Sequence, residues 1–583
     1  MPAAPDLLGC PNLLALLRGQ AETLADRPFL WRKRDGAYQP LTWREVADTI
    51  GRVAAGLADL GVTAGDRVML VGENRPEWLM TDLGIMAAGA VTVPAYTTNT
   101  EDDHRHILRH SGAVGAVVSS PALARTVIAA AADAPDCRWI VVMDDGLDDP
   151  GHLPAHRWAD LAATAGGDRL DQAAGTLRRG DLAGFIYTSG TSGRPKAVML
   201  SHGSALSNCH GARALLADFD LSNEVFLSFL PASHAYERTL GQFLPIALGA
   251  QIYYGEGIEA LARNIDEARP TLLACVPRML DAMRQRIERT VAREGGMKAR
   301  LFNQTLDLGR RRHTGTLGVM DRVTDAMLER LVRETFRARF GGRVKALVSA
   351  GAALDPEVGL FFTAMGLPVL QGYGQTEAGP MISGNTPERP RMDSVGRPIE
   401  TTELRIAGDG EILVRGEGVM LGYWNDPAAT AEAIRDGWLH TGDIGVIDPD
   451  GHVRITDRKK DIIVLSGGDN VSPARIETVL AQQPAILQAA VFGDDADAGL
   501  TAVVVPDPEF VKTLPAEDPA TVQAAMRRAV DDANRGLGVF ERVRAVVVAD
   551  EPFTIAQGLL TPTLKIRRHL VRQRYAEQLK GRR

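Results

Sequence analysis

The first part of the chain alternates between helical and strand-like spacings of hydrophobic residues. Between residues 41 and 60, Val46, Ile50, Val53 and Leu57 recur every three or four positions, which predicts a helix with one buried face. Short apolar runs predict buried strands at residues 67–71, 91–94, 113–119, 139–143 and 182–187, and a further helix is expected at residues 76–90. This alternation indicates an α/β fold in which helices cover a parallel sheet.

Two segments interrupt the alternation. Residues 284–342 are charged and helical in pattern, which predicts a helical excursion before the sheet resumes at residues 344–348 and 368–370. Residues 165–181 are rich in Gly, Asp and Ala, and we expect a loop there that leads into the strand at residues 182–187.

The pattern changes after about residue 400. Residues 403–406 and 411–414 alternate between apolar and polar positions, as half-exposed strands do, and turn-forming residues flank them. Strands are also expected at residues 453–456 and 462–465, followed by a helix from Pro473 to Ala481. We predict an α/β protein with two domains. A large, multi-subdomain N-terminal domain of helix-covered sheets spans residues 1–459, and a small α+β domain spans residues 460–583.

Composition narrows the class of protein. The chain has 583 residues, of which 45% are hydrophobic and 24% are charged, as in soluble globular proteins. Its net charge of -8 argues against a nucleic-acid partner, because nucleic-acid binders carry basic domains. The four cysteines form no CxxC pair, which favours a reducing, cytoplasmic setting. We expect no signal peptide, and we expect the longest uncharged stretch, residues 239–255, in the core.

The strongest chemical signal is the loop after the strand at residues 182–187. Its glycines let the backbone approach a ligand closely, and its hydroxyl side chains and final lysine suit phosphate oxygens. The residues predicted to bind phosphate are Thr188, Ser189, Gly190, Thr191, Ser192, Gly193 and Lys196. A Walker loop needs its lysine directly after the last glycine, and Pro195 breaks that pattern. The sequence therefore predicts a nucleotide site of another kind.

This string resembles the phosphate loop of the adenylate-forming superfamily, which includes acyl-CoA synthetases, luciferases and the adenylation domains of peptide synthetases. The resemblance covers essentially the whole chain. At residues 371–377 it implies that Tyr373 stacks on adenine, Thr376 bonds the α-phosphate and Glu377 holds Mg²⁺, with Thr188 as a second metal ligand. The same resemblance assigns further residues to the nucleotide site, namely Gly351, Ala352, Gln371, Gly372 and Gly374.

Later segments also resemble superfamily motifs. Asp443, in Thr-Gly-Asp, is implied to bind both ribose hydroxyls, and Arg458 is implied to reach the ribose as well. Lys460 falls at the position of the interdomain hinge, and Gly467 and Gly468 resemble a loop of the thiol tunnel.

The end of the chain and one internal motif point to a subgroup. Lys565, in Thr-Leu-Lys, falls where the superfamily has its adenylation lysine. Leu564 departs from the glycine of distant members, and long-chain acyl-CoA synthetases tolerate that departure. Residues 230–238 resemble a motif of the same group, which implies that His234 lies beside the substrate carboxylate. The helical segment 284–342 resembles an element of that group too.

The resemblance implies an ATP-dependent ligase that converts a fatty acid to acyl-AMP and then, with coenzyme A, to acyl-CoA. Alternatives are the same chemistry on an aryl or medium-chain acid, and a fatty-acyl-AMP ligase that loads a carrier protein. A luciferase-type oxygenase has no supporting feature. A non-enzymatic nucleotide-binding regulator is disfavoured, because Lys196, Glu377, Asp443, Arg458 and Lys565 are all present.

The expected partners are fatty acid, ATP and CoA. Residues 565–583 are basic and could touch anionic lipid on the inner membrane surface, although a solvated helix face explains them equally well. The sequence does not indicate the oligomeric state, and a homodimer is only an analogy to the family.

Overall fold

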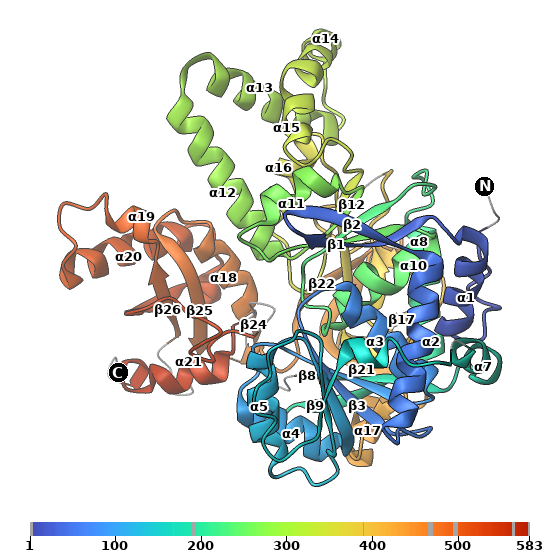
Figure 1. The fold of residues 1–583 in the computed structure, drawn as a ribbon. Helices are drawn as coiled ribbons and strands as arrows, with labels where there is room; N and C mark the ends of the chain where they lie inside the picture. Colours follow the sequence, from blue (N-terminus) through green and yellow to red (C-terminus); the bar gives the residue numbers. More distant parts are fainter. Residues whose placement is uncertain are drawn as a thin grey trace.

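Two large sheets form the body of the protein (Figure 1). The computed structural model describes residues 4–166, 168–188, 194–388, 390–464, 470–493, 499–561 and 566–580. A helical projection rises above this body, and a small C-terminal domain lies beside it (Figure 1). The predicted α/β class with a large N-terminal and a small C-terminal domain is confirmed.

The first sheet has eight strands in the order β19-β9-β8-β4-β3-β5-β6-β7. Strands β8, β4, β3, β5, β6 and β7 run parallel, whereas β9 and β19 are antiparallel additions at one edge. The strands are β3 (Arg67–Val71), β4 (Val91–Ala95), β5 (Ala113–Val118), β6 (Ile140–Val142), β7 (Ala155–Arg157), β8 (Leu182–Thr188), β9 (Lys196–Ser201) and β19 (Gly422–Tyr423).

Helices cover both faces of this sheet, as the sequence predicts. Met69 and Val71 pack in one cluster with α4 (Glu101–Ser111) and α5 (Pro121–Ala131). Val68 and Leu70 pack in another with α2 (Trp43–Asp59) and α3 (Pro76–Ala87). Successive side chains of a strand point to opposite faces, so one apolar run supplies both layers.

The second sheet has nine strands in the order β16-β15-β14-β13-β12-β10-β11-β1-β2. Six of them, β14, β13, β12, β10, β11 and β1, run parallel, so their carboxyl ends meet at one edge. The strands are β1 (Pro28–Arg34), β2 (Ala37–Thr42), β10 (Val225–Ser228), β11 (Gln251–Tyr254), β12 (Leu272–Cys275), β13 (Ala346–Ser349), β14 (Val369–Gly374), β15 (Met381–Gly384) and β16 (Arg397–Pro398).

A third, antiparallel sheet follows in the chain. It consists of β17 (Thr402–Ile406), β18 (Glu411–Gly416), β20 (Ile434–Arg435), β21 (Trp438–Ile447) and β22 (Val453–Arg458). One hydrophobic cluster joins all three sheets, with Ile186 and Val198 from the first, Tyr373 from the second, and Val414 and Leu439 from the third. The place where the sheets meet is therefore held by apolar burial.

The C-terminal domain is built on β25 (Ile486–Gly493), β26 (Leu500–Pro506) and β27 (Val543–Val548). Helices α18 (Pro473–Ala481) and α20 (Pro519–Asn534) share one core cluster with these strands, and residues of α21 (Arg568–Arg574) share another. The helix predicted from Pro473 to Ala481 has those bounds. One contact to the body is the Gln482 amide, which donates to Asp355 Oδ2 at 3.0 Å.

The segment 165–181 is not a loop, as we expected, because it contains helix α7 (Arg169–Thr176). Leu170, Ala173 and Ala174 are buried in the main core cluster, and the Asn12 amide donates to the Ala174 carbonyl at 3.0 Å. Tertiary burial of three small or apolar side chains outweighs the weak local propensity of this composition.

The predicted helical excursion is confirmed and begins earlier than expected, at Pro277. It comprises α12 (Pro277–Glu294), α13 (Gly296–His313), α14 (Val319–Leu328), η2 (Glu329–Arg333) and α15 (Glu334–Ala338). Arg333 is fully buried at its base. Its Nη1 lies 2.8 Å from Asp325 Oδ1, and its Nε donates to the Ala364 carbonyl at 2.7 Å.

Replacing Arg333 with alanine should lower the thermal unfolding midpoint, because the buried Asp325 would keep only the half-exposed Arg312 as a charged partner. Breaking a buried pair completely costs about 3–5 kcal/mol, so we expect a smaller loss of stability here. The exposed Arg330→Ala is the matched control and should change stability by less than about 0.5 kcal/mol. Differential scanning fluorimetry measures both variants, and equal shifts would show that Arg333 does not anchor the projection.

Candidate active site

The predicted site residues gather at the carboxyl edges of the two parallel sheets. The phosphate loop follows β8, the segment with His234 follows β10, Gly351 follows β13, and Glu377 follows β14. Parallel strands bring loops that are distant in sequence to one edge, where open α/β sheets bind their ligands. Strand order in the nine-stranded sheet therefore unites three of these segments, and the packing of Ile186 on β8 with Tyr373 on β14 joins the strand before the phosphate loop to them.

A buried carboxylate joins three of the predicted nucleotide residues. Asp443 on β21 lies opposite Arg458 on β22, and Arg458 Nε donates to Asp443 Oδ1 at 3.0 Å. The Tyr373 hydroxyl donates to Asp443 Oδ2 at 2.7 Å. Burial and then the Asp443 charge raise the pKa of Tyr373 well above its usual value, so the phenol stays a donor. Burial alone would lower the pKa of Arg458, but Asp443 and the other carboxylates around it raise it.

A second group links two motifs through a residue that the sequence reasoning missed. The Tyr423 hydroxyl donates to Glu377 Oε1 at 2.9 Å, and Lys196 Nζ lies 5.1 Å from the centre of the Tyr423 ring. Tyr423 thus connects the metal-ligand candidate to the phosphate-loop lysine. The signal available in the sequence was the aromatic pair Tyr423-Trp424 after Gly422, in a chain with only 5% aromatic residues.

The two ends of the phosphate loop are anchored by neighbouring elements. Thr188 pairs with Lys196 across β8 and β9, and Lys196 Nζ lies 3.6 Å from Asp426 Oδ2. His106 Nε2 hydrogen-bonds the Pro195 carbonyl at 2.9 Å, and His110 Nδ1 bonds the Tyr187 hydroxyl at 2.9 Å. The loop residues Ser189, Gly190, Thr191, Ser192 and Gly193 lie outside the described residues.

The loop that carries His234 is fixed by local hydrogen bonds. His234 Nδ1 accepts the Tyr236 N–H at 3.2 Å and so caps the short helix α9 (Ala235–Glu237), which leaves the proton of a neutral ring on Nε2. The Tyr236 hydroxyl donates to the Val348 carbonyl at 2.8 Å. This bond joins the His234 loop to the end of β13, beside Gly351.

Beneath this loop lies a buried polar network. The Ser228 hydroxyl donates to Glu237 Oε1 at 2.7 Å and accepts the amides of Asn74 and Gln242, each at 2.8 Å. Asn74 also accepts the Ala232 N–H at 3.0 Å. Burial raises the pKa of Glu237 to about 8, so its carboxyl group is protonated at neutral pH. The network holds the loop from below.

The remaining predicted nucleotide residues occupy the ends of β13 and β14. Gly351 has a φ of 91°, a left-handed conformation that favours glycine, and Ala352 is exposed next to it. A Cβ atom on Gly374 would lie 1.8 Å from the Pro380 carbonyl oxygen, so only glycine fits there. Gln371 is buried, and its amide donates to the Met392 carbonyl at 2.9 Å. Gly372 precedes Tyr373 on β14, and Thr376 begins the short turn η3 (Thr376–Ala378) after that strand.

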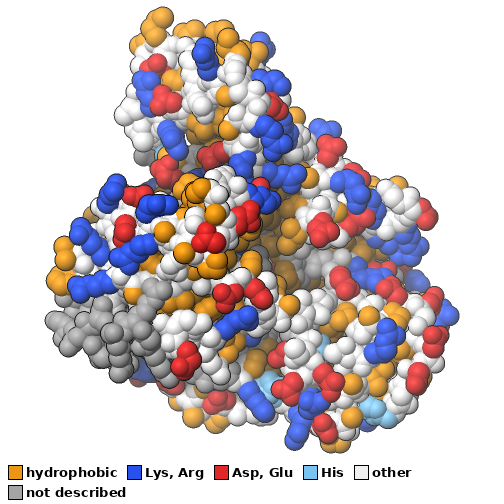
Figure 2. Space-filling model, turned by 90° about the vertical axis from the view of Figure 1, so that its left-hand side faces the viewer, with side chains coloured by type: hydrophobic (Ala, Val, Ile, Leu, Met, Phe, Trp, Pro, Cys, Tyr) orange, Lys and Arg blue, Asp and Glu red, His pale blue; other side chains and the backbone are white. Residues whose placement is uncertain are grey.

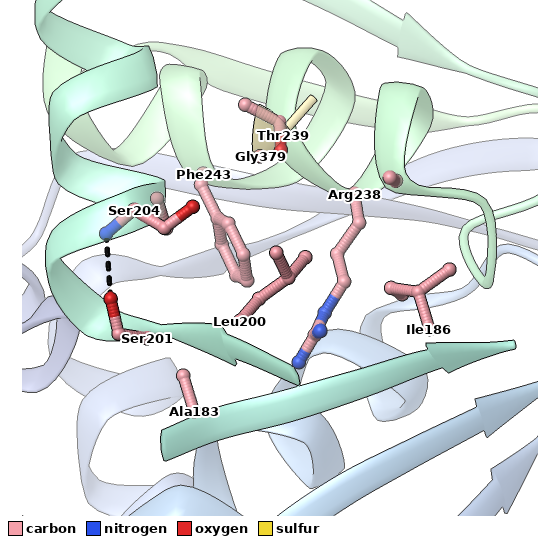
Figure 3. Close-up of a pocket in the computed structure, with 11 residues that line it drawn as sticks. Ala183, Ile186, Leu200, Ser201, Ser204, Arg238, Thr239, Phe243 and Gly379 are labelled. Atoms are coloured by element: carbon pink, nitrogen blue, oxygen red, sulfur yellow. Dashed lines mark hydrogen bonds between the residues drawn. The ribbon is translucent and has the colours of Figure 1, made fainter. Parts of the chain in front are cut away.

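A small cavity lies behind the site, between β8, β9 and the helical turn after His234 (Figure 3). Arg238 points into it beside Ile186 and Leu200, and its guanidinium pairs with the buried Asp82 at 2.6 Å. The cavity has a volume of ≈ 20 Å³, which suits about one water molecule. It is too small to receive an acyl chain.

Several predicted residues lie apart from this cluster or beyond the described residues. Lys460 is exposed in the turn after β22. Gly467, Gly468 and Lys565 lie outside the described residues.

The donor chemistry of the site fits Mg²⁺. The described residues contain no group of three or more His, Cys, Asp or Glu side chains placed to hold a metal ion. Mg²⁺ bound with a nucleotide needs only one or two protein oxygens besides the phosphates, because it keeps several waters. The Glu377 carboxylate, which accepts the Tyr423 hydroxyl, and the Thr188 hydroxyl are the oxygens that would hold the ion.

The site thus contains a buried aspartate that a tyrosine and an arginine share, and a glutamate–tyrosine–lysine group lies beside it, next to the ends of parallel strands. This arrangement defines a nucleotide-using enzyme of the adenylate-forming class. Residues 17–424 match the family described as AMP-binding enzyme, and residues 460–581 match the AMP-binding enzyme C-terminal domain. The chain belongs to the AMP-binding enzyme family, and within it to the long-chain acyl-CoA synthetase group. The family expected from the motifs is thereby confirmed.

Known relatives match almost the whole chain. It is 34% identical to the long-chain-fatty-acid–CoA ligase FadD15 of Mycobacterium tuberculosis, over 98% of this chain and 96% of that protein. It is 31% identical to the peroxisomal long chain acyl-CoA synthetase 6 of Arabidopsis thaliana, over 93% and 81% of the two chains.

Solved structures share the fold. The adenylation domain of a carboxylate reductase from Mycobacterium chelonae aligns with a TM-score of 0.78 at 22% identity, over 99% of this chain and 93% of that one. An anthranilate CoA ligase in complex with anthranoyl-AMP aligns with a TM-score of 0.75 at 22% identity, over 100% and 99%. Among the described residues, no helix is both long and apolar enough to cross a membrane.

Replacing Tyr373 with phenylalanine should raise the KM for ATP about tenfold while leaving the fold intact. The change removes one hydrogen bond to a charged group, worth about 1.5–3 kcal/mol, and frees the Asp443 carboxylate to turn. Steady-state kinetics with varied ATP measure the effect. Tyr38→Phe, at the opposite edge of the nine-stranded sheet, is the control, because it also loses one hydroxyl bond, to the Tyr254 carbonyl. An unchanged KM in Tyr373→Phe would remove Tyr373 from the site.

Glu237 should make stability fall as pH rises. Its folded pKa of about 8 lies above the unfolded value of about 4.3, so between these values the folded state binds more protons than the unfolded state. Each step up in pH within that window therefore disfavours the wild-type fold. Glu237→Gln removes the titration, so its unfolding midpoint relative to wild type should rise steadily from about pH 5 to pH 8. A constant difference across that range would show that Glu237 does not titrate there.

Proposed function

We propose that this protein is an acid–thiol ligase that forms an acyl-adenylate from a carboxylic acid and ATP and then transfers the acyl group to coenzyme A. In the first step the acid's carboxylate oxygen attacks the α-phosphorus, and pyrophosphate leaves. In the second step the thiol sulfur attacks the acyl carbon, and AMP leaves. The observation that carries the proposal is the Tyr373–Asp443–Arg458 cluster beside Glu377 and Lys196, where the three sheets meet.

Fatty acids, and long-chain ones in particular, are the proposed substrates. The support comes from the relatives named above, which are called long-chain-fatty-acid–CoA ligase and long chain acyl-CoA synthetase and are 31–34% identical over nearly the full chain. The same chemistry on an aryl or medium-chain acid, or transfer to a carrier protein, is the alternative that an assay must separate.

The nucleoside would be held by residues of the second and third sheets. Asp443 and Arg458 would bind the ribose hydroxyls, and the Tyr373 ring would face adenine with Gly351 and Ala352. Thr376 would bond the α-phosphate. The fixed register of β21 and β22 and the bond from Tyr373 support this assignment, because they hold the carboxylate in place before the ligand arrives.

Electrostatics explains the charged residues around the phosphates. The attacking carboxylate and the α-phosphate are both anions, and two unit charges about 4 Å apart repel by about 4 kcal/mol at an effective dielectric of about 20. Lys196 and the loop from Thr188 would offset the charge on the pyrophosphate, and the Nε2–H of His234 would donate a hydrogen bond to the carboxylate. Mg²⁺, when bound by Glu377 and Thr188, supplies further positive charge at the phosphates.

The C-terminal domain would carry the remaining residues. We place the domain boundary at residues 459/460, with Lys460 as the hinge, and the match of the second family to residues 460–581 supports it. Lys565 would stabilise the first step, and the loop with Gly467 and Gly468 would form part of the thiol tunnel in the second. We also propose a cytoplasmic location, which the free thiols of Cys10, Cys137, Cys209 and Cys275 support.

Substrate class can be tested directly. AMP release should depend on CoA and should be fastest with long-chain fatty acids when medium-chain, long-chain and aryl acids are compared. Preference for benzoate or a medium-chain acid would overturn the long-chain assignment, and thioester formation only on a carrier protein would replace CoA. Absence of AMP with every acid would favour a non-catalytic regulator.

Lys565→Ala should abolish pyrophosphate release from acid and ATP but largely spare thioester formation from supplied acyl-adenylate. The reason is that the lysine would neutralise charge only while the α-phosphate is attacked. Isotope exchange between pyrophosphate and ATP measures the first step, and acyl-CoA formation measures the second. Lys512→Ala, whose ammonium pairs with Glu509 on the surface, is the control. Equal loss in both steps would contradict the two-state scheme.

A further inference from the structure

The helix α14 and the turn η2 after it expose a continuous apolar face. Val319, Met320, Val323, Met327 and Leu331 are 60–80% exposed. From Met320 onward they recur at intervals of three and four positions, and Val319 precedes Val323 by four, which is the spacing of one helix face. A row of five large exposed hydrophobic side chains on one helix is unusual on a soluble protein and marks an interaction surface.

The opposite face of the same helix and turn carries acidic side chains, which form ion pairs with the rest of the projection. Asp321 pairs with Arg311, Asp325 lies 2.8 Å from Arg333, and Glu329 lies 2.6 Å from Arg337. These contacts, with the buried Leu328 beside them, anchor the helix on the rest of the projection. The polarity is the reverse of an ordinary surface helix, whose apolar face turns inward. Packing within the chain therefore does not explain the outward apolar face.

Positive charge is concentrated on the same projection. Residues 277–343 contain sixteen Lys and Arg against eight Asp and Glu, a net charge of +8 in a chain whose total is -8. Arg322 and Arg330 lie on the exposed side of α14 and η2 among the apolar residues, and neither forms an ion pair with any described residue. Figure 2 shows hydrophobic and basic side chains together on the tip.

We propose that this outward face, formed by Val319, Met320, Arg322, Val323, Met327, Arg330 and Leu331, docks on the surface of an anionic phospholipid bilayer. The apolar side chains would enter the boundary between headgroups and acyl chains, and the two arginines would contact phosphates. Apolar insertion and basic charge together give reversible binding, whereas either alone is marginal. The tip is the part of the projection farthest from the body, so it can reach a flat surface first (Figure 1).

The positive charge of the projection favours an anionic membrane over a second copy of the chain as the partner of this face. A symmetric dimer through the tip would bring two projections of net charge +8 together, which is unfavourable. An anionic membrane offers both an apolar interior and the opposite charge. The proposal stands independently of the fatty-acid substrate, although such a substrate partitions into the same bilayer.

Vesicle sedimentation of the full-length protein tests the proposal. Wild type should bind vesicles of phosphatidylcholine and phosphatidylglycerol at about 7 to 3, bind pure phosphatidylcholine much more weakly, and lose binding as NaCl rises from about 0.1 M to 0.5 M. The double variant Val323→Ser/Met327→Ser should bind anionic vesicles at least about tenfold more weakly. Arg322→Gln/Arg330→Gln should also weaken binding about tenfold and reduce its salt dependence.

The matched control is Val539→Ser/Phe540→Ser, which removes an equally exposed apolar pair from the C-terminal domain and should bind like wild type. Wild-type binding by the Val323/Met327 variant, or no binding by wild type, would overturn the proposal. A dimer in vesicle-free sedimentation velocity that the same variant abolishes would assign the face to a second copy instead. AMP release with dissolved acid should be unchanged in this variant, so the docking proposal and the ligase proposal can fail separately.

Discussion

The buried carboxylate of Asp443 is the constraint on which the site depends. It is only 4% exposed, and a charge removed from water in this way is costly unless strong donors surround it. Tyr373 from the nine-stranded sheet and Arg458 from the antiparallel sheet supply those donors. Satisfying one charge therefore aligns two sheets, and the same alignment sets the distance between the adenine and ribose candidates.

Apolar burial provides the frame for that polar contact. The cluster that joins Ile186, Tyr373 and Leu439 lies where the three sheets meet, so the Tyr373 ring packs against the core while its hydroxyl reaches Asp443. Tyr423, at the edge of the eight-stranded sheet, also makes both kinds of contact. Its hydroxyl donates to Glu377, and its ring lies under Lys196. Aromatic residues with a polar end are suited to such positions, because they satisfy packing and hydrogen bonding together.

The projection differs from the body in the outward face of one helix. Its inner side combines ion pairs around Arg333 with buried apolar side chains such as Phe302 and Phe336, whereas the outward face of α14 is apolar and exposed. Stability of the projection therefore depends on apolar burial together with a few compensated charges.

Much of the fold could be read from local patterns. The strand at Arg67–Val71 and the helix at Pro473–Ala481 have the predicted bounds, because an uninterrupted apolar run and a proline at the first helical position are strong local signals. Helix α7 could not be read in this way, since its stability comes from Leu170, Ala173 and Ala174 packing on distant helices.

The sequence alone determined the chemistry of the site, because motif residues such as Asp443, Arg458 and Glu377 are defined by type and order along the chain. Only the tertiary structure decided which of them touch and that Tyr423 joins them. Contacts such as Tyr373–Asp443, which joins residues 70 positions apart, depend on strand order and register, which no local pattern encodes.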